Sequence, residues 1–224
     1  MTNTFSIILI IFTFFCFRNI TLAAPAEQPW LVDPYYLQRI KDINTYPARP
    51  QEILFTGDSI TEGCDWKAVL HRDDVWGYGI GGDKTFGITH RLSMIAAVKP
   101  RQLFILIGVN DIRSGWTIDE TIANYKLLLT ACKAQLPDTM IYIQSVMPMN
   151  FNIHNNEFVT SNDWVVLLNV KIKRLAQQYN YQYIDLYPKM LDQNGMLFAS
   201  YSDDGLHLNA TGHQAWAKLL SPYL

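Results

Sequence analysis

Five short apolar runs, spaced along the chain between residues 52 and 186, predict five β-strands. They read EILF, VWGYGI, QLFILIG, MIYIQSV and YQYIDL. The third run is apolar almost without interruption, which is typical of a central strand that is buried on both faces of a parallel sheet. The spacing of the runs leaves room for a helix in most of the connections between them.

The connecting segments have the periodicity of helices. Ile88, Leu92 and Ile95 fall on one helical face, and apolar residues recur at helical spacing over Ile118–Gln135, with Pro137 just beyond its end. Strands that alternate with helices indicate an α/β fold, with a mainly parallel sheet covered by helices on both faces. Further helices are predicted from Trp66 in WKAVLH, over Trp164–Tyr179 and over His213–Leu220.

The first residues depart from this pattern. Phe5–Phe17 is a nearly unbroken apolar run, shorter than the about 20 residues of a membrane-spanning helix. The small residues of TLAAPA follow it, as at a signal-peptidase site. We therefore predict a signal peptide over residues 1–24, with the mature protein secreted or periplasmic and not held in a membrane. An uncleaved anchor is the alternative, because Met1–Thr4 contains no Lys or Arg.

Two segments are predicted after the leader. Residues 25–50 are rich in proline and aromatic residues and are expected to form an N-terminal arm, with a short helix near Tyr35–Ile43. Residues 51–224 are expected to form one α/β domain, which suits their length. The longest irregular stretch inside it is Met147–Asp163, and a loop of that length in a compact domain is often functional.

Composition and charge narrow the classes of partner. The chain of 224 residues is 49% hydrophobic and 17% charged, and its net charge of −2 comes without a long run of one sign. Neither nucleic acid nor an anionic membrane surface is therefore expected as a partner, and oligomeric state is left open. Without CxxC, HExxH or zinc-ligand spacing, we expect no metal and no other cofactor. Export would permit a disulfide between Cys64 and Cys132, but two ordinary thiols are favoured.

Polar motifs follow the strands at the edge where open parallel sheets form their sites. They are Gly57-Asp58-Ser59, then GIGGD, then GVND, and DDGLHLN after the last strand. A serine hydroxyl becomes a nucleophile when a base takes its proton. His207 could be that base, and Asp204, three residues earlier, could orient its ring.

An oxyanion site is also available. The backbone N–H groups of Ser59 and Gly82 and the side-chain amide of Asn110 are candidate donors to a tetrahedral intermediate. Each motif alone has an ordinary interpretation: Ser59 as the N-cap of a helix, GIGGD as a turn, Asn110 as a helix entry and His207 as a packed or surface histidine. Together, and in this order, they provide every role that acyl transfer requires.

The four motifs resemble the blocks of the SGNH hydrolases, the GDSL-type esterases and lipases. Here they read GDSITEG, GIGGD, GVND and DGLH, and the resemblance covers the chain from about Glu52 to its end. It implies a flavodoxin-like, three-layer αβα sandwich with a mainly parallel five-stranded sheet. GIGGD is similar to the acetylhydrolase branch, which favours short acyl groups. The resemblance implies a catalytic triad of Ser59, Asp204 and His207 and an oxyanion hole of Ser59, Gly82 and Asn110.

The predicted function is that of a secreted serine esterase. An exported, nearly neutral esterase would meet polymers or lipids, and we favour removal of O-acetyl groups from carbohydrate through an acyl-enzyme. Trp66, Trp116 and His154 are candidate substrate-binding residues, with core packing as the alternative for each tryptophan. A lysophospholipase or thioesterase-type lipid acylhydrolase is the alternative enzyme. A non-catalytic secreted carbohydrate-binding protein is a further alternative, which the intact motifs oppose.

Overall fold

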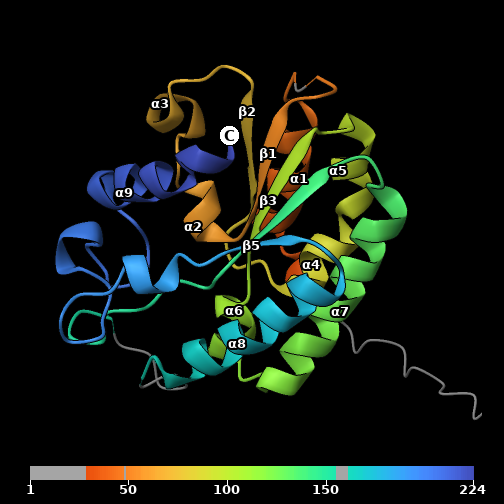
Figure 1. Cartoon of the computed structure of the whole chain (residues 1–224). Coiled ribbons are helices and arrows are strands. Elements are labelled where there is room, and N and C mark those ends of the chain that lie inside the picture. Colours follow the sequence, from red (N-terminus) through yellow and green to blue (C-terminus); the bar gives the residue numbers. More distant parts are fainter. Residues whose placement is uncertain (1–28, 48, 155–160) are drawn as a thin grey trace, which may run out of the picture.

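Figure 1 shows the computed structural model, which describes residues 29–47, 49–154 and 161–224. The predicted signal peptide over residues 1–24 lies outside the described residues, as does the start of the predicted arm. The rest of the arm contains a helix at the predicted place, α1 (Pro34–Asn44), after a 3-10 turn η1 (Pro29–Val32).

Five parallel strands form one sheet in the order β2-β1-β3-β4-β5. This is the flavodoxin-like order, and helices cover both faces of the sheet (Figure 1). The predicted α/β class and the three-layer arrangement are therefore confirmed. The strands are β1 (Ile53–Gly57), β2 (Val75–Gly79), β3 (Gln102–Leu106), β4 (Met140–Gln144) and β5 (Gln182–Ile184).

The register brings the ends of the central strands together. Gly57 at the end of β1 pairs with Gly79 of β2 on one side and with Leu106 of β3 on the other. Chain order reverses between β1 and β3, which is where open α/β sheets bind their ligands. The segments that leave these three strands therefore start side by side at one edge of the sheet.

The helices form two layers. α3 packs against α9 on one face of the sheet, whereas α4, α5 and α8 contact α7 on the other (Figure 1). The helices after α1 are α2 (Ser59–Glu62), α3 (Trp66–Leu70), α4 (Thr85–His90), α5 (Leu92–Val98), α6 (Val109–Arg113), α7 (Ile118–Gln135), α8 (Asp163–Gln178) and α9 (Ala210–Leu220), with 3-10 turns η2 (Tyr187–Lys189), η3 (Ala199–Tyr201) and η4 (Ser221–Tyr223).

One predicted helix is divided in two. Ile88, Leu92 and Ile95 all face the core as expected, but α4 ends at His90 and α5 begins at Leu92. Arg91, between them, turns its guanidinium group inward to a buried carboxylate. This contact with Asp83, which the hydrophobic pattern does not report, accompanies the break.

Cys64 and Cys132 are both buried and unpaired, so the favoured interpretation of two ordinary thiols is confirmed. No helix in the described part of the chain is long and apolar enough to cross a membrane. Within the same residues, no group of three or more His, Cys, Asp or Glu side chains is arranged to hold a metal ion.

Candidate active site

Ser59 is the first residue of α2, directly after β1. The cap of this helix is Asp58, whose Oδ1 accepts a hydrogen bond from the N–H of Ile60 (3.0 Å). The interpretation of Ser59 as the N-cap is therefore wrong, because the preceding residue has that role. The Ser59 hydroxyl instead lies 2.9 Å from Nε2 of His207.

A hydrogen-bonded chain continues from His207 to Asp204. Nδ1 of His207 lies 2.6 Å from Oδ2 of Asp204. The other oxygen, Oδ1, accepts the N–H groups of Leu206 (2.9 Å) and His207 (2.8 Å). Burial by itself would raise the pKa of Asp204, but the hydrogen bonds from the His207 ring and from these N–H groups hold that pKa below its usual range. The carboxylate is therefore ionised beside the imidazole.

The loop after β4 supports the Asp204 turn. The N–H of Asn150 donates to the carbonyl of Gly205 (2.8 Å), and Nδ1 of His154 lies 3.1 Å from the carbonyl oxygen of Asp204. Gly205 has a φ of 79°, and a Cβ there would lie 2.4 Å from the Asn150 carbonyl oxygen. Glycine is required at this close approach. His154 thus contacts the acid-bearing turn, and its binding of substrate stays a prediction.

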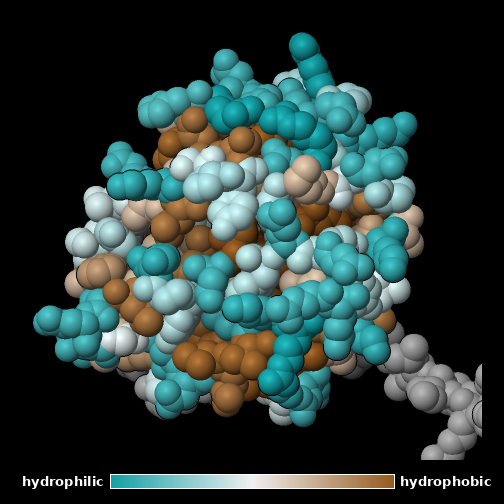
Figure 2. All heavy atoms as spheres, in the orientation of Figure 1, coloured by the Kyte–Doolittle hydropathy of each residue, from teal (hydrophilic) through white to brown (hydrophobic). Residues whose placement is uncertain are grey.

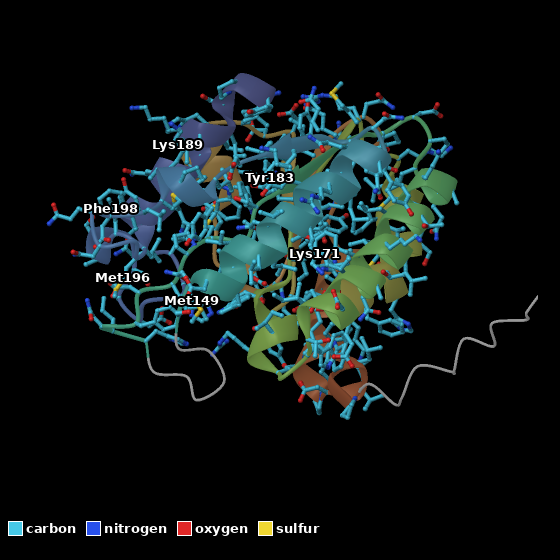
Figure 3. All side chains as sticks on the ribbon, turned by 60° about the horizontal axis from the view of Figure 1, so that its bottom comes forward. Met149, Lys171, Tyr183, Lys189, Met196 and Phe198 are labelled. Atoms are coloured by element: carbon cyan, nitrogen blue, oxygen red, sulfur yellow. The ribbon has the colours of Figure 1, made fainter. Side chains whose placement is uncertain are left out.

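The same loop also forms hydrogen bonds with the segment around Leu197. The N–H of Leu197 donates to the Met149 carbonyl (3.3 Å), and Nδ2 of Asn150 donates to the Leu197 carbonyl (2.9 Å). Figure 3 shows Met149 beside Met196 at this junction. The predicted functional loop therefore has a structural role in its described part, because it connects the Asp204 turn to the segment around Leu197.

The predicted oxyanion donors lie just after the ends of three adjacent strands, β1, β2 and β3. Gly82 follows β2, is exposed and has a φ of 74°, and a Cβ there would meet nothing within 4 Å. Asn110, on α6 after β3, is buried; its Nδ2 donates to the Asp83 carbonyl (3.1 Å) and its Oδ1 accepts a long hydrogen bond from Arg113 Nη1 (3.4 Å). One N–H of the Asn110 amide is thus left for a ligand.

A buried ion pair fixes the segment that carries Gly82. Nε of Arg91 lies 2.9 Å from Oδ2 of Asp83, and both side chains are buried. The same guanidinium donates to the carbonyls of Tyr78 (2.8 Å) and Gly57 (3.2 Å), at the ends of β2 and β1. Burial raises the pKa of Asp83, and Arg91 opposes that rise. These bonds connect two strand ends to the GIGGD segment.

Two further carboxyl groups are buried at this edge. Burial raises the pKa of Asp58 to about 7, and Asp83 and Asp111 add to the rise while Arg113 opposes it. Burial likewise raises the pKa of Asp111 to about 6, against hydrogen bonds from Thr85. The side of the site that holds Gly82 and Asn110 therefore rests on buried ionisable groups.

The two tryptophans predicted to bind substrate differ. Trp66 is 2% exposed and stacks on Phe55, with 3.7 Å between ring centroids. Its ring belongs to the core and cannot stack on a sugar, so the prediction for Trp66 is wrong and the alternative of core packing holds. Trp116 is half-buried and packs edge-on against Trp30 of the arm at 5.8 Å. A role for Trp116 in substrate binding stays a prediction.

Two polar side chains at the site were not singled out from the sequence. Arg113 follows Asn110 by three residues, a spacing at which side chains of a helix meet, so its contact with the Asn110 amide could have been found. Glu62 at the end of α2 contacts residues of other segments. No local pattern signals those contacts.

Comparison with known proteins places the chain among acyl hydrolases. Residues 55–215 match the sequence profile of the GDSL-like lipase/acylhydrolase family. The human platelet-activating factor acetylhydrolase IB subunit alpha1 is 22% identical over 186 residues, which cover 77% of this chain and 75% of that protein.

Solved structures agree with the fold. A provisionally named platelet activating factor from Streptococcus pneumonia has a TM-score of 0.78 and 27% identity, with 87% of this chain and 94% of that chain covered. An acetyl xylan esterase from Geobacillus stearothermophilus has a TM-score of 0.63 and 20% identity, with 78% and 94% covered.

Proposed function

The chain belongs to the GDSL-like lipase/acylhydrolase family and is an ester hydrolase, and we propose that it removes short acyl groups, in the first place O-acetyl groups on carbohydrate, through a serine nucleophile. One observation carries the proposal: the unbroken series of contacts from the Ser59 hydroxyl to the His207 ring and the Asp204 carboxylate. Gly82 and Asn110 follow β2 and β3, the two strands that pair with the strand before Ser59.

The proposed reaction proceeds in two halves. Ser59 Oγ attacks the acyl carbonyl carbon while His207 Nε2 takes the hydroxyl proton. The carbonyl oxygen becomes an oxyanion, to which the N–H groups of Ser59, Gly82 and Asn110 donate. The intermediate collapses, the alcohol leaves with the proton from His207, and an acyl-enzyme remains. Water, activated by the same imidazole, then releases the carboxylic acid and restores Ser59.

Asp204 would act on the base rather than on the substrate. By accepting the Nδ1–H of His207, its carboxylate keeps the tautomer in which Nε2 presents a lone pair to the serine. It also stabilises the imidazolium that forms when the serine proton is taken. Because the pKa of Asp204 lies below its usual range, the carboxylate would keep this charge well into acid.

The proposed acyl group and substrate rest on the names of similar proteins, on the predicted export and on residues near the site. The curated relative and the Geobacillus protein are named as enzymes of acetyl groups. The predicted export over residues 1–24 would bring the enzyme to polymers outside the cytoplasm. Trp116 and His154 are proposed to contact the substrate, since both flank segments that bear predicted catalytic or oxyanion groups.

Replacement of the nucleophile tests the proposal directly. We expect Ser59→Ala to lower the hydrolysis of p-nitrophenyl acetate by about 10³-fold or more, because the remaining groups cannot form the acyl-enzyme. Ser93→Ala, at an exposed position on α5, is the matched control and should keep the wild-type rate. A Ser59→Ala enzyme with the wild-type rate would refute the assignment.

A lipid acylhydrolase of the lysophospholipase or thioesterase type is the second candidate. One surface feature favours it: α8 exposes Val166 (43%), Leu167 (57%) and Val170 (45%), and Figure 2 shows a hydrophobic patch on the part of the surface over this helix. Exposed aliphatic side chains of this kind often mark contact with another apolar surface.

A substrate panel separates the candidates. Acetyl, butyryl, octanoyl and dodecanoyl p-nitrophenyl esters are compared with acetylated xylan and with a lysophospholipid. We expect kcat/KM to fall steeply beyond the shortest acyl groups and acetate to be released from the glycan. A preference for the long esters and the lysophospholipid would instead support the lipid enzyme. No turnover of any ester, with retained glycan binding, would support the carbohydrate-binding alternative.

A further inference from the structure

The N-terminal arm contacts the segment that carries Gly82 through one side chain, Glu62. Tyr35 on α1 donates its hydroxyl to Glu62 Oε2 (2.6 Å), and the same oxygen accepts the N–H of Gly81 (2.6 Å). Arg39 on α1 brings its Nε within 2.5 Å of the other oxygen, Oε1, as an ion pair rather than an aligned hydrogen bond. The arm, Glu62 and the residue before Gly82 are thus linked.

These contacts restrict the peptide that bears the proposed oxyanion donor. The direction of the Gly82 N–H is set by the backbone rotations of Gly81. A charge-assisted hydrogen bond on the Gly81 N–H limits those rotations. Gly81 also lies close to the arm, since a Cβ there would lie 3.2 Å from the Tyr35 hydroxyl oxygen.

The charge of Glu62 needs compensation. A free carboxylate next to a developing oxyanion would repel it, and it would lower the benefit of the donors. The guanidinium of Arg39 and the hydroxyl of Tyr35 bind the two oxygens of Glu62. Arg39 also donates to the carbonyl of Gly79 (3.4 Å), at the start of the same segment.

The arm also contacts residues that follow the GIGGD segment. Trp30 in η1 lies under the ammonium group of Lys84, with 3.9 Å between Nζ and the ring centroid, and Trp30 also packs against Trp116 after α6. Tyr36 donates a long hydrogen bond to the Gly87 carbonyl (3.4 Å). The arm therefore contacts residues on both sides of Gly82, although the matched family region begins only at residue 55.

We propose that the N-terminal arm is a positioning element of the oxyanion site, in which Tyr35 and Arg39 hold Glu62, and Glu62 holds the Gly81–Gly82 peptide so that its N–H points to the oxyanion. This rests on the proposed function, because it takes Gly82 as an oxyanion donor. The arm acts through Glu62 and does not touch the reacting atoms.

Single substitutions in α1 test the effect on turnover. We expect Tyr35→Phe and Arg39→Met to lower kcat for p-nitrophenyl acetate by about 3- to 30-fold with KM within about twofold, as partial loss of a donor whose full removal costs about 10²–10³. Tyr35 is half-exposed, so its hydroxyl can be removed without damage to the core. Arg39→Lys should restore most of the Arg39→Met loss. Gln38→Ala, which affects an exposed contact with Asp42 on the same helix, should have no effect.

A double-mutant cycle separates positioning from general stabilisation. If Tyr35 acts through Glu62, Tyr35→Phe should change kcat little once Glu62→Gln is present, although each substitution alone lowers it. The proposal is overturned if the arm variants lower the melting temperature but keep the wild-type kcat, or if the two effects multiply fully. In either case Ser59-dependent hydrolysis by the wild type would persist, whereas loss of that dependence would refute the proposed function itself.

Discussion

The turn that carries Asp204 and His207 and the segment that carries Gly82 lie at the same edge of the sheet but are held by different kinds of interaction. In the Asp204 turn, the side chains of Asp204 and His207 are 50% and 47% exposed, and the hydrogen bonds that the Asp204 carboxylate accepts from Leu206 and His207 join residues no more than three apart. The Gly82 segment is fixed by a buried ion pair and by contacts to Glu62.

The difference matches what each group is proposed to do. A general base gains and loses a proton in every turnover, and a half-exposed position keeps its charged form solvated. Oxyanion donors must keep their direction while charge develops, because their advantage over water is that they do not reorganise. The buried framework around Asp83 and Arg91 would supply that rigidity.

The largest effect is expected on the exposed side, and mainly on activity. Asp204→Asn should lower kcat by about 10³–10⁴, since an amide cannot stabilise the imidazolium and favours the wrong tautomer of His207. The free energy of unfolding should change by only about 1 kcal/mol, because the Asp204 side chain is half-exposed and exposed ion pairs contribute little to stability. Steady-state kinetics and urea denaturation measure both, with the neighbouring Asp203→Asn as control. A comparable loss in Asp203→Asn would mean that the acid has been assigned to the wrong residue.

On the buried side, the expected effect is on stability. Asp83→Asn leaves the Arg91 guanidinium without its counter-charge in the core, which costs about 3–5 kcal/mol. Urea denaturation of this variant and of Arg91→Met would measure the cost. If Asp83→Asn unfolds with the wild-type midpoint, the buried ion pair does not hold the segment, and the contrast between the two sides fails.

The smallest effect concerns the pH dependence of stability. The pKa of Asp58 is about 7 in the folded protein, against an ordinary value of 3.8. Between these values the folded protein binds a proton that the unfolded chain has lost, so stability falls as pH rises through about 4 to 7. Asp58→Asn should remove about 1–3 kcal/mol of this fall. Melting temperatures from pH 4 to 8 test it, and an unchanged slope would refute the raised pKa.

The features that could be predicted from the sequence are those that local patterns encode. The predicted bounds of α7 agree with the structure, because apolar residues recur at helical spacing over Ile118–Gln135 and Pro137 follows; a capping box of Thr117 and Glu120 begins the helix. The proximity of Ser59 and His207 could also be predicted. Their motifs follow strands of one parallel sheet, and such strands end at the same edge.

The features that could not be predicted depend on contacts between different elements of the fold. The break at Arg91 follows a contact with Asp83 on another segment, and the burial of Trp66 depends on Phe55 in β1. The position of the helix cap differed by one residue, because Asp58 and Ser59 are both good N-cap residues and only the three-dimensional structure distinguishes them. The arm carries no sequence motif that signals its contacts with Glu62, Lys84 and Trp116.

The backbone of Gly82 has a consequence for which residues the position can accept. A methyl group there would meet nothing within 4 Å, yet φ is 74°, so an L-residue is disfavoured by chirality and not by volume. Within the protein, the backbone conformation of Gly82 therefore selects for handedness rather than for size, and glycine is the only achiral residue among the standard amino acids. A D-alanine introduced by chemical synthesis prefers this half of conformational space, and its comparison with L-alanine would measure what handedness contributes to the oxyanion site.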